Sequence, residues 1–185
     1  MTTRLLTLTA LTASLLLCLS SAARAACIAA PLRDGDFESQ RNGSVRSPWA
    51  REGNAGIDIG RGFSSRGRNN AWARNTSGWN AIRQSLRLTK GVTYTLRAHI
   101  RTSGNVRDGY FGYRNAAGQP VKEMKFGASP RYRDHWIKFK PKTTGNYQVF
   151  AGLWAPGADA WIQVDNVRLE IPCDDVILNP VPPED

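Results

Sequence analysis

Residues that hold metals or act as nucleophiles are scarce in this chain of 185 residues. It contains three cysteines, two histidines and two methionines. It also lacks a serine-hydrolase elbow, a glycine-rich phosphate-binding loop and a zinc-binding motif. The cysteines that follow the N-terminal apolar stretch have no histidine near them, so they make no zinc site. These absences argue against the common hydrolase, nucleotide-binding and zinc-dependent classes.

Long apolar runs are missing after the first 25 residues. Residues 1–25 have the pattern of a secretory signal peptide, because Arg4 supplies a positive start, residues 5–19 are apolar, and residues 23–25 resemble a cleavage site. The apolar run is short for a membrane span. We therefore expect a signal peptide over residues 1–25, no transmembrane segment, and a protein that is secreted or periplasmic.

The cysteines support export. Cys18 lies within the expected signal peptide, and Cys27 and Cys173 lie at the two ends of the remaining sequence. Two cysteines that bracket a domain in an oxidising compartment predict a disulfide between the terminal strands. Closing so long a loop contributes about 4–5 kcal/mol in the chain-entropy model. We expect one domain over residues 27–173 and a proline-rich, disordered tail over residues 174–185.

Basic residues outnumber acidic residues, 25 to 15. The formal net charge is +10, and without Arg4 and Arg24 it is +8. This charge favours an acidic glycan or an anionic surface as partner. The alternative is that the charge reflects a general preference for arginine and has no binding role, because 19 of the 25 basic residues are arginines spread along the chain. No basic run marks a recognition helix, so we do not expect nucleic acid binding.

No segment shows sustained helical periodicity, whereas short alternating segments recur between turn signals. In residues 93–102, Tyr94, Leu96, Ala98 and Ile100 fall on one face of a strand, and the residues between them are polar or charged. Sequence repeats are absent. The pattern predicts an all-β protein, a β-sandwich of two antiparallel sheets.

The stretch from Gln148 to Leu169 predicts two strands around a short turn. One alternating set is apolar and suits a core: Val149, Ala151, Leu153, Ile162 and Val164. The other set combines aromatic rings, amides and a glycine that would let a ligand approach: Gln148, Phe150, Gly152, Trp154, Trp161 and Gln163. Flat aromatics with a few amides suit the apolar faces and hydroxyl edges of sugars. The alternative is that these aromatics close a second hydrophobic layer.

Four blocks of sequence resemble the CenC-type carbohydrate-binding modules. They occur in the family's order over roughly residues 32–171: Asp34-Gly35-Asp36-Phe37-Glu38, then Arg74-Asn75 with Trp79 and Gln84, then Gly91-Val92-Thr93-Tyr94-Thr95-Leu96, and finally Gln163-Val164-Asp165-Asn166-Val167-Arg168-Leu169. The resemblance, which extends to carbohydrate-binding module families 4, 9 and 22, implies a galactose-binding-domain-like β-jelly roll. It also implies polysaccharide binding along a concave sheet face and a structural calcium ion.

The resemblance also implies site residues. It assigns the calcium to Asp36, Glu38 and Asp165, whose carboxylates are the hard oxygen ligands that calcium prefers. It makes Trp79 a stacking platform for sugar. If the alternation holds, further residues join it on one sheet face: Arg97, His99, Arg101, Tyr110, Phe150, Trp154, Trp161 and Gln163. Arginines among aromatics would suit an acidic glycan, although a merely solvated face is the alternative for them.

Three hypotheses follow. The first is a secreted, monomeric, non-catalytic protein that binds a polysaccharide. The second is an interaction or structural protein that binds an anionic surface or a protein partner. The third is a jelly-roll polysaccharide lyase that uses His99 and Tyr110 with an arginine to neutralise a uronate.

Overall fold

The protein is a β-sandwich. The computed structural model describes residues 26–28 and 32–172, and these contain strands but no helix. Because helices are absent from this part of the chain, no helix there could cross a membrane. The strands are β1 (Ala26–Ile28), β2 (Trp49–Glu52), β3 (Ala55–Ile59), β4 (Asn69–Leu88), β5 (Tyr94–Thr102), β6 (Asp108–Asn115), β7 (Pro120–Phe126), β8 (Arg133–Phe139) and β9 (Gly145–Pro172). The predicted all-β class is confirmed.

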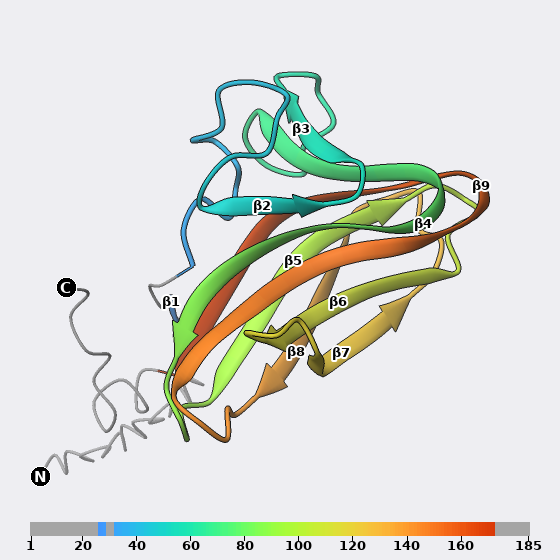
Figure 1. The fold of residues 1–185 in the computed structure, drawn as a ribbon. Coiled ribbons are helices and arrows are strands. Elements are labelled where there is room, and N and C mark those ends of the chain that lie inside the picture. The colour runs from blue at the N-terminus through green and yellow to red at the C-terminus, as the bar shows by residue number, and fades with distance from the viewer. Residues whose placement is uncertain (1–25, 29–31, 173–185) are drawn as a thin grey trace, which may run out of the picture.

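Two long strands, β4 and β9, connect the two layers. They pair antiparallel along their length, with a register irregularity between Asn75 and Ser77, and they turn over together at one end of the molecule (Figure 1). On one side of this bend they lie with β2, β6 and β7, a layer that we call the β6 sheet. On the other side they lie with β3, β5 and β8, the β5 sheet, which β1 extends beside the end of β9.

The predicted hairpin over Gln148–Leu169 is wrong. Both predicted strands belong to β9, and each pairs with β4 rather than with the other: Trp154 lies opposite Trp79, and Trp161 lies opposite Arg74. The turn signal around Pro156 and Gly157 marks the place where the two-stranded ribbon bends. Residues 75–78 of β4, whose Asn-Thr-Ser-Gly sequence is typical of a turn, form the matching bend. Turn residues therefore located the bend but did not reveal the pairing partner.

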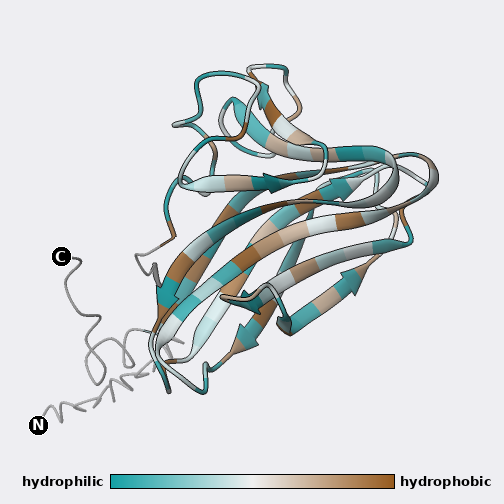
Figure 2. Cartoon of the chain, in the orientation of Figure 1, coloured by the Kyte–Doolittle hydropathy of each residue, from teal (hydrophilic) through white to brown (hydrophobic). Residues whose placement is uncertain are grey.

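The inward sets predicted from alternation are confirmed. In β5, Tyr94, Leu96, Ala98 and Ile100 are all buried, and the inward residues of β9 are buried as well. Hydrophobic and hydrophilic residues alternate along the strands in Figure 2. Burying an aliphatic side chain fully contributes about 1.5–3 kcal/mol, so this alternation drives the two sheets together.

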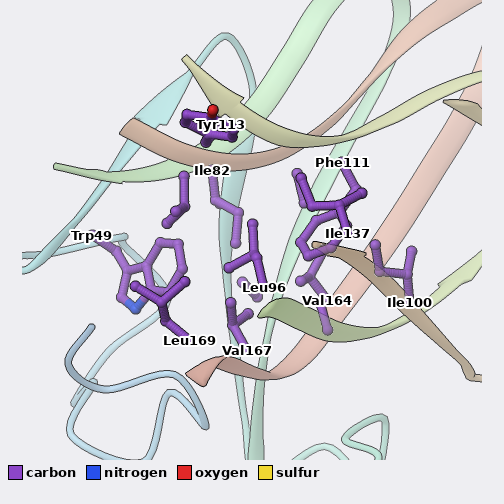
Figure 3. Close-up of a cluster of buried hydrophobic side chains, with 14 of the residues drawn as sticks. Trp49, Ile82, Leu96, Ile100, Phe111, Tyr113, Ile137, Val164, Val167 and Leu169 are labelled. Carbon is purple, nitrogen blue, oxygen red and sulfur yellow. The ribbon is translucent and has the colours of Figure 1, made fainter. Parts of the chain in front are cut away.

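Side chains of both sheets meet in one core. Figure 3 shows Ile82 and Phe111 of the β6 sheet facing Leu96 and Val164 of the β5 sheet. The rings of Tyr113 (β6) and Phe139 (β8) stack across the layers with centroids 3.9 Å apart. The inner faces are therefore occupied by packing, and any ligand must bind on an outer face or an edge.

The two ends of the described domain lie side by side. Cys27 lies opposite Ile171 in the pairing of β1 with β9. Cys173 lies outside the described residues, so the disulfide remains a prediction. The expected signal peptide (1–25) and the expected tail (174–185) also lie outside them.

Candidate functional site

The predicted ligand-binding residues lie on two outer faces rather than on one. The β6 sheet carries Trp79, Tyr110, Phe150 and Trp154, and the β5 sheet carries Arg97, His99, Arg101, Trp161 and Gln163. The expectation that Tyr110 shares a face with the arginines is wrong. Although β5 and β6 follow each other in sequence, β5 pairs with residues 162–170 of β9 and β6 pairs with residues 147–154. The bend of β9 separates these segments into different layers.

An aromatic cluster forms the centre of the outer face of the β6 sheet. The ring of Trp79 lies 5.8 Å from that of Trp154, 6.2 Å from that of Tyr110 and 6.0 Å from that of Phe150. Trp154 is 54% exposed, whereas Phe150 is only 2% exposed. We call Trp79, Tyr110 and Trp154 the Trp platform. Phe150 lies on the same outer face but is covered by its neighbours, so it cannot stack on a sugar.

A glycine of β9 supports the platform. A Cβ atom added at Gly152 would lie 2.6 Å from ring atoms of Trp79 and 2.6 Å from Cβ of Ala81. The glycine therefore makes room for the Trp79 ring to lie across β9. The expectation that Gly152 lets a ligand approach the backbone is wrong, because the indole already fills that space.

An ion network borders the platform. The carboxylate of Glu52 (β2) accepts hydrogen bonds from Nε1 of Trp79 at 2.5 Å and from Arg114 at 3.0 Å, and it pairs with Arg83 at 3.2 Å. The Arg114 guanidinium lies 3.9 Å from the centroid of the Phe150 ring. Arg114 therefore covers Phe150, and Glu52 fixes the orientation of Trp79.

Sequence reasoning missed Glu52, Arg83 and Arg114. Glu52 lies in a segment whose glycine, serine and asparagine content predicts a loop, although it includes strand β2. Arg83 and Arg114 alternate with inward residues in β4 and β6, which is the available sequence signal. Alternation alone does not show that all three meet beside Trp79.

A cleft with a volume of about 720 Å³ lies on the outer face of the β5 sheet. Trp72, Trp161 and Phe63 line it together with Arg101 and Asp58. Gly56 makes room for Trp72, because a Cβ atom there would lie 2.5 Å from Cζ2 of the ring. The cleft thus resembles the platform in construction, since in both a tryptophan of β4 lies against a glycine of the neighbouring strand.

Arg101 stands among aromatic rings at one side of this cleft. Its guanidinium lies 5.1 Å from the ring centroid of Tyr132, 5.6 Å from that of Phe63 and 6.0 Å from that of Trp161. Its Nε donates a hydrogen bond to the side-chain oxygen of Gln163. Burial raises the pKa of Tyr132, which keeps this phenol neutral. The predicted combination of Arg101, Trp161 and Gln163 is therefore present, although it is separated from the Trp platform.

His99 holds the loop between β3 and β4 against the β5 sheet. Nδ2 of Asn166 donates to Nε2 of His99 at 3.3 Å, and Nδ1 of His99 lies 2.8 Å from the hydroxyl of Ser65. That hydroxyl in turn donates to Asp165 at 2.9 Å. Burial lowers the pKa of His99. The lyase hypothesis loses its basis, because His99 is engaged in this network and Tyr110 lies on the opposite outer face.

Arg97 is the remaining predicted residue of the β5 sheet. It forms an ion pair with Asp134 of the neighbouring strand, and this hydrogen bond raises the pKa of Arg97. Arg97 lies near Trp136, which is opposite it in β8. It does not line the cleft.

The proposed calcium ligands are used by the protein itself. Oδ2 of Asp165 accepts backbone hydrogen bonds from Ser65 at 2.7 Å and Arg66 at 2.9 Å, and Oδ1 accepts one from Asn166 at 2.6 Å. Burial raises the pKa of Asp165, while these donors act in the opposite direction.

The other two carboxylates are also engaged. Oε1 of Glu38 accepts hydrogen bonds from the backbone of Arg68 and Asn69 at 2.6 and 2.8 Å, and the exposed Asp36 caps the backbone of Glu38. Within residues 26–28 and 32–172, no three histidine, cysteine or acidic side chains gather as a metal site. The arrangement does not fit calcium coordination by this trio, so calcium remains an expectation from the resemblance alone.

Comparison with known proteins supports the fold assignment. A scan against models of protein families finds no match, and a search of curated proteins finds none either. Solved structures do match. TmCBM61, in complex with β-1,4-galactotriose, has a TM-score of 0.54 at 14% identity, over 75% of this chain and 95% of that one. The C-terminal family 22 carbohydrate-binding module of Clostridium thermocellum Xyn10B has a TM-score of 0.51 at 14% identity, over 77% of this chain and 97% of that one.

A further match is to part of an enzyme. The arabinose-bound MgGH51 α-L-arabinofuranosidase has a TM-score of 0.59 at 14% identity, over 80% of this chain but only 27% of the enzyme. The fold is therefore the antiparallel β-jelly roll found in carbohydrate-binding modules. At these identities the likeness establishes the fold, whereas ligand and activity must be argued from this chain's own residues.

Proposed function

We propose that this protein is a non-catalytic polysaccharide-binding protein whose Trp platform stacks on the sugar rings of a glycan chain. The observation that carries the proposal is the exposure of Trp154 beside Trp79 and Tyr110, on three adjacent strands. Phe150, on the same face, is by comparison only 2% exposed. Carbohydrate-binding modules among the similar folds add support.

The surroundings suit the hydroxyl edges of such a chain. Glu52 offers acceptor atoms, and Arg83 offers donors, both next to Trp79. Glu52 is the close ion-pair partner of both Arg83 and Arg114, so these cations are already engaged and the platform favours a neutral glycan over a charged one. The signal-peptide pattern supports a secreted or periplasmic location, and we propose that one molecule acts as a monomer.

The test compares two equally exposed tryptophans. Trp154 and Trp136 are both 54% exposed, but Trp136 lies on β8 of the other sheet. Replacement of Trp154 by alanine should weaken binding to a neutral β-glucan, xylan or mannan about tenfold, which corresponds to about 1.4 kcal/mol. Trp136→Ala should leave binding unchanged.

Affinity electrophoresis at high and low salt gives the readout. Binding that resists salt and depends on Trp154 supports the platform. If both variants bind as the wild type does, or if the wild type binds no neutral glycan, the proposal is wrong. Binding that vanishes with salt would instead favour an anionic surface as the partner.

A further inference from the structure

The cleft on the β5 sheet is separate from the Trp platform and has its own set of ligand-binding groups. It lies on the opposite outer face, and it takes Trp72 from β4 and Trp161 from β9, the two strands that give Trp79 and Trp154 to the platform. We infer that this cleft is a second glycan site, and that it binds a sugar unit carrying a carboxylate, such as a hexuronic acid.

The aromatic rings indicate a ligand with an apolar face. Phe63 is 44% exposed, and Trp161 is partly exposed at the side of the cleft. A cleft volume of about 720 Å³ falls within the range of roughly 300–1,000 Å³ that is usual for small-ligand sites. Rings of this kind stack on the C–H face of a sugar.

The arginines indicate a negative charge on that ligand. Arg101 has three aromatic rings around it and a neutral amide, Gln163, as its hydrogen-bond partner. Arg61 is 70% exposed along its side chain and lies 3.9 Å from Asp58, which is long for an ion pair. Arg74 also lines the cleft but is paired with Asp159. Among the described residues, Arg61 and Arg101 have no carboxylate at hydrogen-bond distance, so their guanidinium groups suit bidentate binding of an external carboxylate.

Asp58 indicates that the ligand also carries hydroxyl groups. Its Oδ2 accepts hydrogen bonds from Asn70 at 3.2 Å and from Gln163 at 3.0 Å, whereas within the described part of the chain its Oδ1 has only the long contact with Arg61. The Asp58 side chain is only 10% exposed, and its carboxylate at the cleft wall can accept a further hydrogen bond, which a sugar hydroxyl supplies. Phosphate and sulfate ions at neutral pH supply few donors, so a hydroxyl-bearing carboxylate fits better than a simple anion.

Two sites on opposite outer faces would let one molecule join two glycan chains, or two parts of one chain. This joining of two chains rests on the proposed function of the platform. The inference about the cleft does not rest on that proposed function. The two can therefore be tested separately.

Isothermal titration of the full chain at 0.15 M salt tests the cleft. The probes are a galacturonic acid trisaccharide and its methyl ester, which keeps the rings and hydroxyls but removes the charges. In the Trp154→Ala background, which weakens binding of the neutral ester to the platform, the chain should bind the free acid at least tenfold more tightly than the ester. Arg101→Gln should weaken binding of the acid about tenfold. Arg61→Gln should weaken it severalfold, and because Arg61 is exposed this variant does not depend on how Arg101 affects folding.

The controls separate a built site from general positive charge. Arg87→Gln removes an exposed cation of the β6 sheet, and Trp154→Ala removes the platform; both should change binding of the acid less than twofold. Equal weakening by Arg87→Gln, or binding of polyglutamate as tight as that of the trisaccharide, would overturn the inference. So would a wild type that binds no free acid, even if neutral glycans still bind through Trp154. Conversely, binding of the acid that depends on Arg101 would stand even if Trp154→Ala showed the platform to be inactive.

Discussion

The Trp platform and the cleft are built from the same two strands but handle charge differently. On the platform, Glu52 pairs with both Arg83 and Arg114, so each of these cations has a close carboxylate partner in the protein, and Trp154 is left exposed. In the cleft, rings surround Arg101, and the lining carboxylate of Asp58 accepts hydrogen bonds from neutral amides. Equal aromatic content therefore leads to different expected ligands, because the placement of a single carboxylate decides whether arginine remains available.

The largest expected effect comes from replacing the glycine that lies against each β4 tryptophan with alanine. Gly152→Ala places a methyl group 2.6 Å from the Trp79 ring, and Gly56→Ala places one 2.5 Å from the Trp72 ring. Overpacking of this kind costs about 1–3 kcal/mol. Urea unfolding should show that loss in both variants.

Glycan titrations of the same two variants sharpen the comparison. Gly152→Ala should impair neutral-glycan binding and spare the cleft, whereas Gly56→Ala should do the reverse. If both variants lost both activities, the two faces would not be independent.

The second effect concerns the two ring-covering arginines. Arg114→Met should lower the free energy of unfolding by about 2 kcal/mol, because Glu52 loses a mostly buried partner. Arg101→Met should lower it by about 1 kcal/mol, since only ring contacts and an amide hydrogen bond are lost. Urea unfolding at neutral pH measures both. A larger loss for Arg101→Met would contradict the difference in charge pairing drawn between the faces.

The third effect is a pH dependence confined to the β5 sheet. Burial lowers the pKa of His99 and of His135. As the pH falls through about 6.5, the unfolded chain takes up these protons before the folded chain does, so stability is full above that pH and is lost toward the lower folded-state pKa. Calorimetry should show the melting temperature falling by a few degrees over this window.

Two histidine variants test which groups cause this pH dependence of stability. His99→Gln should reduce the fall in melting temperature, and His135→Gln should reduce it separately. Neutral-glycan binding by the platform should stay constant, because its rings lie on the other outer face. An unchanged pH profile in both variants would contradict the assignment.

The smallest expected effect is that of calcium removal. The Asp165 carboxylate receives hydrogen bonds from Ser65, Arg66 and Asn166, so it needs no ion for its stability. EDTA should therefore leave the melting temperature unchanged. A clear decrease, reversed by added calcium, would show that an ion binds and would restore the expectation drawn from the family resemblance.

Local alternation predicted which way side chains face, but it did not predict which segments are neighbours. Along β5 and β9 the inward and outward sets were correct, because a half-buried strand imposes a period of two. Trp154 and Trp161 were nevertheless assigned to one face. Their separation depends on β4, a strand far away in sequence, and a turn signal looks the same whether the chain folds back on itself or a ribbon bends.

Several site residues that escaped prediction depend on distant contacts. Ser65 is 100 positions from Asp165, so nothing local in the sequence indicates that this pair pins the loop beside the cleft. Glu52 meets Arg114 across 62 positions. By contrast, the aromatic content of β9 was visible at once, since Phe150, Trp154 and Trp161 lie in one segment.

The pairing of β1 with the end of β9 also fixes where the folded domain can be held. Ala26 lies opposite Pro172, so both ends of the described chain leave the sandwich at the same pole, away from the bend that links the two sheets. A solid surface attached to either end of the described domain would lie at this pole and would leave both outer faces open to solvent. Capture through either terminus would thus present the tryptophans of both faces equally, and a layer of such molecules could gather two different glycans at one surface.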